Sequence, residues 1–95
     1  MDLLLTYDID TTTTEGQRRL RQMAKLCEGY GHRVQLSVFE MVLNQSQYIQ
    51  LKAKIADLIT NSDHVRLYKL TGQALDEVEI LGATPPTPHR NAWIL

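Results

Sequence analysis

The residues that decide the fold read DLLLTYDI and occupy positions 2–9. Side chains alternate between two faces along an extended chain, and this pattern predicts a β-strand. Leu4 and Thr6 fall on one face, together with Asp8 at the carboxyl end of the strand. The other face carries Leu3, Leu5, Tyr7 and Ile9. Because both faces are apolar near the start, we expect a central strand of a sheet.

A helix is predicted to follow, over about residues 14–30, after a polar threonine loop. Thr12 and Glu15 have the spacing of a capping box that would begin it. Apolar residues recur with helical spacing and predict one buried stripe: Leu20, Met23, Cys27 and Tyr30. A second face is basic and consists of Arg18, Arg21 and Lys25, with Arg19 beside it.

The next segment, residues 32–43, is rich in strand-forming residues, but its apolar positions change parity. Val34, Leu36 and Val38 share one face, whereas Phe39 and Met41 fall on the other. One flat strand cannot stay amphipathic through such a change, so we expect a bend or two short strands meeting near residues 36–39. Beyond it, a second helix is predicted over about 46–60, with a cap at residues Asn44 to Ser46, an end at residues 61–63, and a buried repeat of Tyr48, Leu51, Ile55 and Leu58. A strand over 64–70 and a short edge strand over 78–81 are predicted to follow.

This order predicts an α+β fold, a ferredoxin-like β-α-β-β-α-β sandwich with a short extra C-terminal strand. Residues 1–81 form the domain, and residues 82–95 form a proline-containing linker and tail. Two helices cover only one sheet face, so Leu4 and Thr6 are expected to lie on an open apolar face that a second copy covers. The apolar tail around Trp93 is expected to dock on a sheet edge, in the homodimer on the partner copy.

Composition limits the class of protein. A chain of 95 residues forms one small core and has no room for a deep cleft between two domains. The net charge of −1 means that nucleic-acid binding would need a local basic patch. The single cysteine, Cys27, excludes an intrachain disulfide and a cysteine-cluster zinc site. No signal peptide or membrane-length apolar run is present, so a cytoplasmic protein without membrane association is expected.

Few residues suggest chemistry. The sequence has no glycine-rich phosphate loop and no zinc-peptidase or serine-hydrolase motif. The three histidines, His32, His64 and His89, have no metal-ligand spacing. The position of Asp8 allows two interpretations: it caps a loop, or it is an oxygen ligand for a hard cation such as Mg²⁺. The basic face also allows two interpretations: it is a solvated helix face, or it is a surface that binds along a phosphate backbone.

Two stretches taken together carry a resemblance. LLTYDI at residues 4–9 continues to RRLR at 18–21, and GHRVQLSVFE occupies residues 31–40. The pattern resembles the small CRISPR-associated Cas-two family, the lesser partner of the spacer-acquisition integrase, in its type I-like variants. The likeness extends over nearly the whole chain, through the second helix and the strand at 65–70.

The resemblance implies a ferredoxin-like homodimer and a metal-dependent endonuclease that cleaves single-stranded RNA or double-stranded DNA. It also implies that the dimer bridges two integrase dimers on the DNA of a new spacer. Asp8 would be the metal ligand, for Mg²⁺ or Mn²⁺. Tyr7, Arg19, Arg33 and Phe39 complete the implied catalytic set, and Arg18, Arg19, Arg21, Lys25 and Arg33 form the expected nucleic-acid-binding set.

Three functions stay open at this point. The first is an Mg²⁺-dependent endonuclease whose two Asp8 carboxylates meet at the dimer axis, where a shared cation would relieve their repulsion. The second is a non-catalytic dimeric scaffold that binds the integrase and DNA. The third is a ligand-binding regulatory dimer, for which the sequence offers no glycine-rich ligand loop. Asp8 separates the first two, because only hydrolysis requires it.

Overall fold

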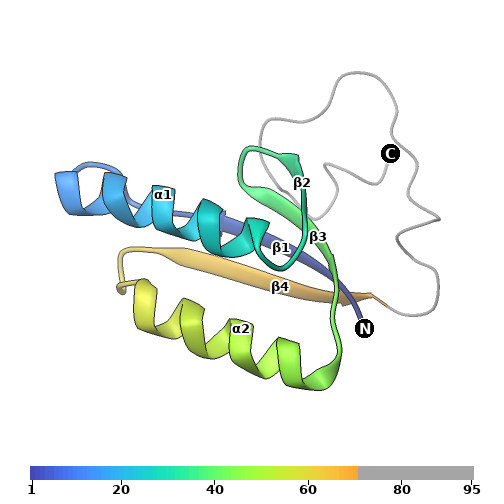
Figure 1. Cartoon of the computed structure of the whole chain (residues 1–95). Coiled ribbons are helices and arrows are strands. Elements are labelled where there is room, and N and C mark those ends of the chain that lie inside the picture. The colour runs from blue at the N-terminus through green and yellow to red at the C-terminus, as the bar shows by residue number, and fades with distance from the viewer. Residues whose placement is uncertain (71–95) are drawn as a thin grey trace.

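The computed structural model describes residues 1–70, so the predicted strand at 78–81 and the linker and tail at 82–95 lie outside the described residues. The expected element order is present (Figure 1). In chain order the elements are β1 (Asp2–Asp8), α1 (Thr14–Glu28), β2 (His32–Gln35), β3 (Val38–Val42), α2 (Gln45–Leu58) and β4 (His64–Leu70).

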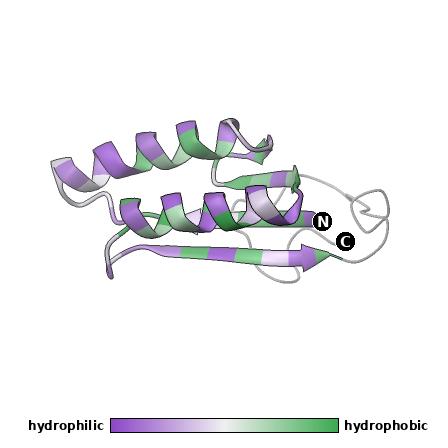
Figure 2. Cartoon of the chain, turned by 60° about the horizontal axis from the view of Figure 1, so that its bottom comes forward, coloured by the Kyte–Doolittle hydropathy of each residue, from purple (hydrophilic) through white to green (hydrophobic). Residues whose placement is uncertain are grey.

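The four strands form one sheet in the order β2-β3-β1-β4, and every neighbouring pair is antiparallel. β1 is therefore an interior strand, as its two apolar faces predicted. Both helices run along the same side of this sheet (Figures 1 and 2). The arrangement confirms the predicted α+β, ferredoxin-like fold. Neither helix within residues 1–70 has the length and apolar character needed to cross a lipid bilayer.

Both helices begin with a side-chain cap. Asn44 and Gln47 form a reciprocal capping box at α2, at the site where the sequence predicted a cap. At α1 the predicted pair of Thr12 and Glu15 was wrong: the hydroxyl of Thr13 caps the helix by accepting a hydrogen bond from the Gly16 amide at 3.0 Å. Thr12 instead donates its amide and its hydroxyl to the Asp10 carboxylate.

The parity change in residues 32–43 is a turn at Leu36 and Ser37 that separates β2 from β3. The pairing also shifts between Arg33 and Gln35, a local irregularity of the kind the parity change predicted. β3 buries Val38, Phe39 and Met41, whereas no side chain of β2 is buried. The turn lies beside the carboxyl end of β1, where the Tyr7 amide donates to the Ser37 carbonyl at 3.1 Å.

The core lies between the sheet and the two helices. Met23 and Cys27 of the α1 stripe are buried, whereas Leu20 is exposed and leaves that stripe one residue shorter than predicted. Leu4 and Thr6 are also buried, with 8% and 3% of their surface exposed, so the expectation that they form an open apolar face was wrong. The main core cluster comprises Leu3, Leu5, Tyr7, Ile9, Met23, Cys27, Phe39, Met41, Leu43, Tyr48, Leu51 and Ile55.

Candidate functional site

Asp8 lies at the carboxyl end of β1 with its side chain exposed. Leu3, Leu5 and Tyr7 pack in the core beneath the helices, so alternation places Asp8 on the helix-free face of the sheet. No hydrogen bond or ion pair holds its carboxylate to another residue in the 1–70 range. The carboxylate is therefore solvated and available to an external ligand.

Two segments flank Asp8. On one side lies the β2–β3 turn, and on the other lies His64, which is the register partner of Asp8 in β4 and is also exposed. Directly paired residues of an antiparallel ladder have Cβ atoms about 5 Å apart. No local pattern in the sequence connects these two residues, because they lie 56 positions apart and meet only through the register of β1 and β4.

Tyr7 fixes the turn next to Asp8. Its buried phenol donates to the Leu36 carbonyl at 3.1 Å, in addition to the bond from its amide to Ser37. Burial raises the pKa of Tyr7 above its usual value, and nearby Arg33 opposes part of that rise. The phenol therefore stays protonated at neutral pH, as a hydrogen-bond donor to Leu36 must be.

Arg33 and Phe39 join Tyr7 in one cluster. The rings of Tyr7 and Phe39 stack with centroids 6.2 Å apart, and the Arg33 guanidinium lies 5.3 Å from the Phe39 centroid. An Nη2 to Oε2 distance of 3.8 Å also pairs Arg33 with Glu28 at the end of α1. Phe39 is fully buried and cannot contact a substrate, so it supports Arg33, whose side chain is 37% exposed. Phe39 and Asp8 lie on opposite sides of the sheet by register.

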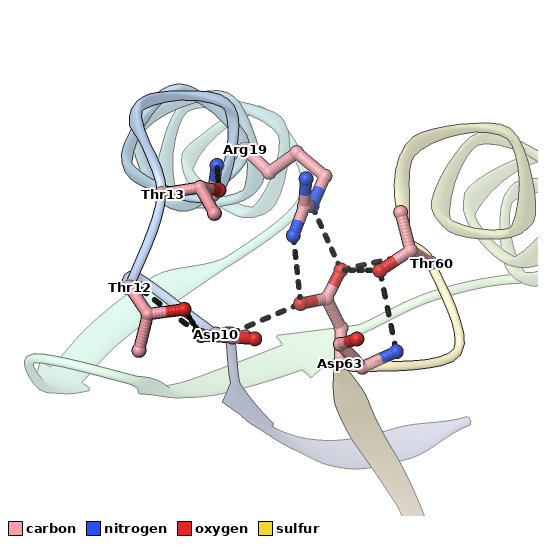
Figure 3. Close-up of polar contacts among 8 residues, drawn as sticks. Asp10, Thr12, Thr13, Arg19, Thr60 and Asp63 are labelled. Carbon is pink, nitrogen blue, oxygen red and sulfur yellow. Dashed lines mark hydrogen bonds and ion pairs between the residues drawn. The ribbon is translucent and has the colours of Figure 1, made fainter.

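Arg19 lies in a different cluster (Figure 3). Its guanidinium binds the Asp63 carboxylate through Nε to Oδ2 at 2.9 Å and Nη2 to Oδ1 at 3.3 Å. Asp63 was predicted only to end the second helix, and its carboxylate also accepts from Asp10 and Thr60. The structure therefore does not bring Arg19 together with Arg33, although the resemblance placed both in one catalytic set.

The basic face of α1 is present. Arg18, Arg21 and Lys25 are exposed and lie three or four positions apart, on one side of the helix. No ion pair to a carboxylate engages any of the three within the part of the chain that the structure describes. Their cationic groups are therefore free to contact an anion.

Potential metal ligands are sparse in the part of the chain that the structure describes. Over residues 1–70 no group of three or more His, Cys, Asp or Glu side chains lies close enough to hold a metal ion. Cys27 is buried, and burial raises the pKa of its thiol to about 12, so it acts as a core residue rather than as a thiolate ligand. Asp8 belongs to no such group in residues 1–70, so a cation site built on it would need further ligands from beyond those residues.

Comparison with known proteins identifies the family. The family described as CRISPR associated protein Cas2 matches residues 1–78. The chain is 42% identical to the CRISPR-associated endonuclease Cas2 of Halalkalibacterium halodurans over 86 residues, which are 90% of each chain. It is 40% identical to the CRISPR-associated endoribonuclease Cas2 of Chlorobaculum tepidum over 96 aligned positions that span all of both chains.

A solved structure agrees with these sequence matches. The crystal structure of Streptococcus pyogenes Cas2 at pH 6.5 superimposes with a TM-score of 0.77 at 41% identity, and covers 86% of this chain and 100% of that one. The family match, the identity over nearly the full length and the shared fold confirm the resemblance carried by residues 4–9 and 31–40: the chain belongs to the CRISPR-associated Cas2 family.

Proposed function

We propose that this Cas2-family chain is a divalent-metal-dependent endonuclease of CRISPR spacer acquisition, and that it works as a homodimer. The observation that carries the proposal is the carboxylate of Asp8, which is exposed and has no hydrogen-bond partner in residues 1–70. A carboxylate held at the end of a rigid interior strand, with no structural partner, is well placed to bind a cation. Relatives named endonuclease and endoribonuclease support the reaction class.

The residues present fit a shared Mg²⁺ or Mn²⁺ ion better than a site within one chain. Mg²⁺ in proteins commonly keeps several waters and binds through one or two carboxylates plus substrate phosphate oxygens. One Asp8 from each of two copies supplies that number of carboxylates. A bound ion would neutralise phosphate charge and lower the pKa of a water molecule. The part played by this chain is to hold Asp8 on a fixed strand, between His64 and the turn that Tyr7 anchors.

The basic face and Arg33 are proposed to hold the nucleic-acid backbone. Arg18, Arg21 and Lys25 are exposed on α1, in the layer of helices that Figure 2 shows on one side of the sheet. Alternation along β1 places Asp8 on the other side. Contacts to phosphates give binding that does not depend on base sequence and weakens steeply with salt. Since the two surfaces are separate in one chain, substitutions should separate nucleic-acid binding from cleavage.

The family also supports two further assignments that we propose for this chain. The dimer bridges the larger integrase of the spacer-acquisition complex on DNA, and the protein works in the cytoplasm. The free thiol of Cys27 fits a reducing compartment. A scaffold without hydrolytic activity would make the same partner and DNA contacts and would not require Asp8.

The test is metal-dependent cleavage by Asp8→Asn, which keeps the shape of the side chain and removes its charge. We expect the variant to lose cleavage of single-stranded RNA and double-stranded DNA by about a hundredfold or more, while nucleic-acid affinity stays within about twofold. Chelation of the metal should abolish cleavage by the parent protein. Asp57→Asn is the matched control, because Asp57 is exposed on α2 and takes no part in the site. Equal rates for Asp8→Asn and the parent would overturn the proposal in favour of the scaffold.

A further inference from the structure

Asp63 is a buried charge with every lone-pair direction engaged. Its side chain has no exposed surface. Its carboxylate accepts hydrogen bonds from the Asp10 amide at 3.0 Å, from the Thr60 amide at 2.9 Å and from the Thr60 hydroxyl at 3.2 Å, besides the two from Arg19 (Figure 3). An enclosed carboxylate is costly unless it is paired and hydrogen-bonded in this way. Such a network is rigid and has one arrangement.

These bonds join the connection between α2 and β4 to two consecutive segments near the start of the chain. Asp10 belongs to the loop between β1 and α1, Arg19 to α1, and Thr60 to the connection between α2 and β4. Asp10 follows Asp8 by two residues, so the bond to its amide fixes the chain directly after the candidate metal ligand. The start of α1 packs tightly against the same loop, since a Cβ atom at Gly16 would lie 1.8 Å from the Asp10 carbonyl oxygen.

Arg19 makes a fork-like contact that a point charge cannot reproduce. Its Nε and Nη2 atoms reach different oxygens of the Asp63 carboxylate, and only 16% of its side chain is exposed. Arginine presents such parallel N–H groups in a fixed plane, whereas lysine does not. Arg18 and Arg21, one helical position before and two after, are exposed and make no such bond.

We propose that Arg19 and Asp63 are positioning residues of the nuclease: they lock the loop that follows Asp8, and Arg19 acts through Asp63 rather than on the nucleic acid. The effect of this pair on catalysis rests on the proposed nuclease function. The contacts between Arg19, Asp63 and the loop after Asp8 do not depend on that function. It separates Arg19 from Arg18, Arg21 and Lys25, with which sequence reasoning had grouped it. On α1, the surface proposed to bind phosphates then consists of Arg18, Arg21 and Lys25 without Arg19.

The test compares Arg19→Lys, Asp63→Asn and the double variant with the parent at saturating metal. Each single variant should lower kcat about tenfold or more at a KM within about twofold, and the double variant should be no worse than either single one, because the two residues act as a unit. Lys54→Arg makes the reverse change of head group at an exposed position of α2, outside both the network and the basic face, and should leave kcat unchanged. Arg19→Gln should leave the salt dependence of nucleic-acid affinity unaltered, whereas one lost phosphate contact would flatten the slope by about 0.7–0.9.

General destabilisation is controlled with Ile55→Val, which weakens the buried side of α2 without touching the network. At a temperature where all variants are folded by circular dichroism, this control should keep the kcat of the parent. Additive losses, a raised KM or a flatter salt slope for the Arg19 variants would overturn the proposal, as would full activity of Arg19→Lys.

Amide hydrogen exchange tests whether Arg19 and Asp63 hold the loop after Asp8 without any measurement of nuclease activity. Arg19→Lys should speed exchange of the Asp10 amide about tenfold or more, while amides of the β1–β3 ladder keep their protection. If Asp8→Asn shows that the chain is not a nuclease, this measurement still decides whether the pair holds the loop. Unchanged exchange at Asp10 in Arg19→Lys would overturn the positioning role whatever the cleavage assay shows.

Discussion

Asp63 remains ionised because its hydrogen bonds outweigh the cost of its burial. Removal from water raises the pKa of the carboxyl, but the bonds from Arg19, Thr60 and Asp10 favour the charged form and lower the pKa to about 2. A carboxyl whose pKa is lowered on folding stabilises the fold at all pH values above its ordinary pKa near 4. That stabilisation is lost as the pH falls from about 4 to about 2.

Acid unfolding of Asp63→Asn tests this contribution. A lowering of roughly two pH units corresponds to a stabilisation on the order of 2 kcal/mol at neutral pH. Urea unfolding should therefore show a deficit of about that size for Asp63→Asn at pH 7, and the gap to the parent should close towards pH 2. Hydrogen bonds from Thr12 also lower the pKa of Asp10. Because the parent and Asp63→Asn both contain Asp10, its contribution cancels when their free energies of unfolding are compared. A gap that stays constant between pH 7 and pH 2 would contradict the assignment.

Single residues were predictable from sequence only where their partners are close in the chain. The alternation in residues 2–9 placed Tyr7 in the core and Asp8 on the opposite face, and Asn44 was recognised as a cap. The network of Asp63 was not foreseen, because Arg19 lies 44 positions away and no local pattern connects them. The α1 cap was misplaced by one residue, because neighbouring threonines are equivalent in sequence and only the turn at Asp10 distinguishes Thr13 from Thr12.

At the scale of elements, the spacing and parity of apolar residues were sufficient to predict where the helices and strands lie and which helix sides are buried. The parity change located the turn at Leu36 and Ser37, and the helical repeat of Tyr48, Leu51 and Ile55 gave the buried side of α2. The exposed Leu20 shows the limit, since periodicity gives the face of a helix but not where its contact with the sheet ends. Gly29, directly after α1, has an ordinary φ of −75° rather than the left-handed conformation typical of helix C-caps.

Two glycines of α1 provide a matched test of how this helix joins the sheet. In Gly16→Ala the new Cβ would lie 1.8 Å from the Asp10 carbonyl oxygen, so the backbone must move. We expect a loss of about 1–3 kcal/mol, although alanine favours helices, because overlap with backbone cannot relax by a change of rotamer. In Gly29→Ala the nearest atom is the Leu26 carbonyl oxygen at 3.4 Å, so stability should stay level or rise by about 0.4–1 kcal/mol. Thermal unfolding of the two variants measures the contrast, and equal midpoints would contradict it.

For the whole molecule, the sheet separates two sets of residues that the family resemblance had combined. Tyr7, Phe39 and Arg33 gather on the helix side, whereas Asp8 lies on the other side with His64. Alternation along β1 already placed Tyr7 and Asp8 on opposite faces, but the positions of Arg33, Phe39 and His64 depend on strand register, which spacing in the sequence does not give. The proposed site at Asp8 therefore depends on what meets the helix-free face, which under the proposed function is a second copy of the chain.

Metal-dependent dimerisation tests that assembly. If two copies meet through their helix-free faces, their Asp8 carboxylates approach each other, and like charges at close range oppose association unless a cation or proton lies between them. Mg²⁺ should therefore strengthen the dimer of the parent about tenfold, which is about 1.4 kcal/mol. Asp8→Asn removes the repulsion, so its dimer should be at least as stable as the parent in chelator and should not respond to Mg²⁺. Sedimentation velocity over a range of protein concentrations measures both effects.

Asp57→Asn is the control for general charge effects, because Asp57 is exposed on the helix layer, away from the proposed contact, and its substitution should leave the response to Mg²⁺ unchanged. A parent protein that stays monomeric at all concentrations would contradict the dimer itself. A dimer of Asp8→Asn that still tightens with Mg²⁺ would place the cation elsewhere. In that case the shared carboxylate site would lose its support, while a dimer that presents the basic face of α1 to nucleic acid would remain possible.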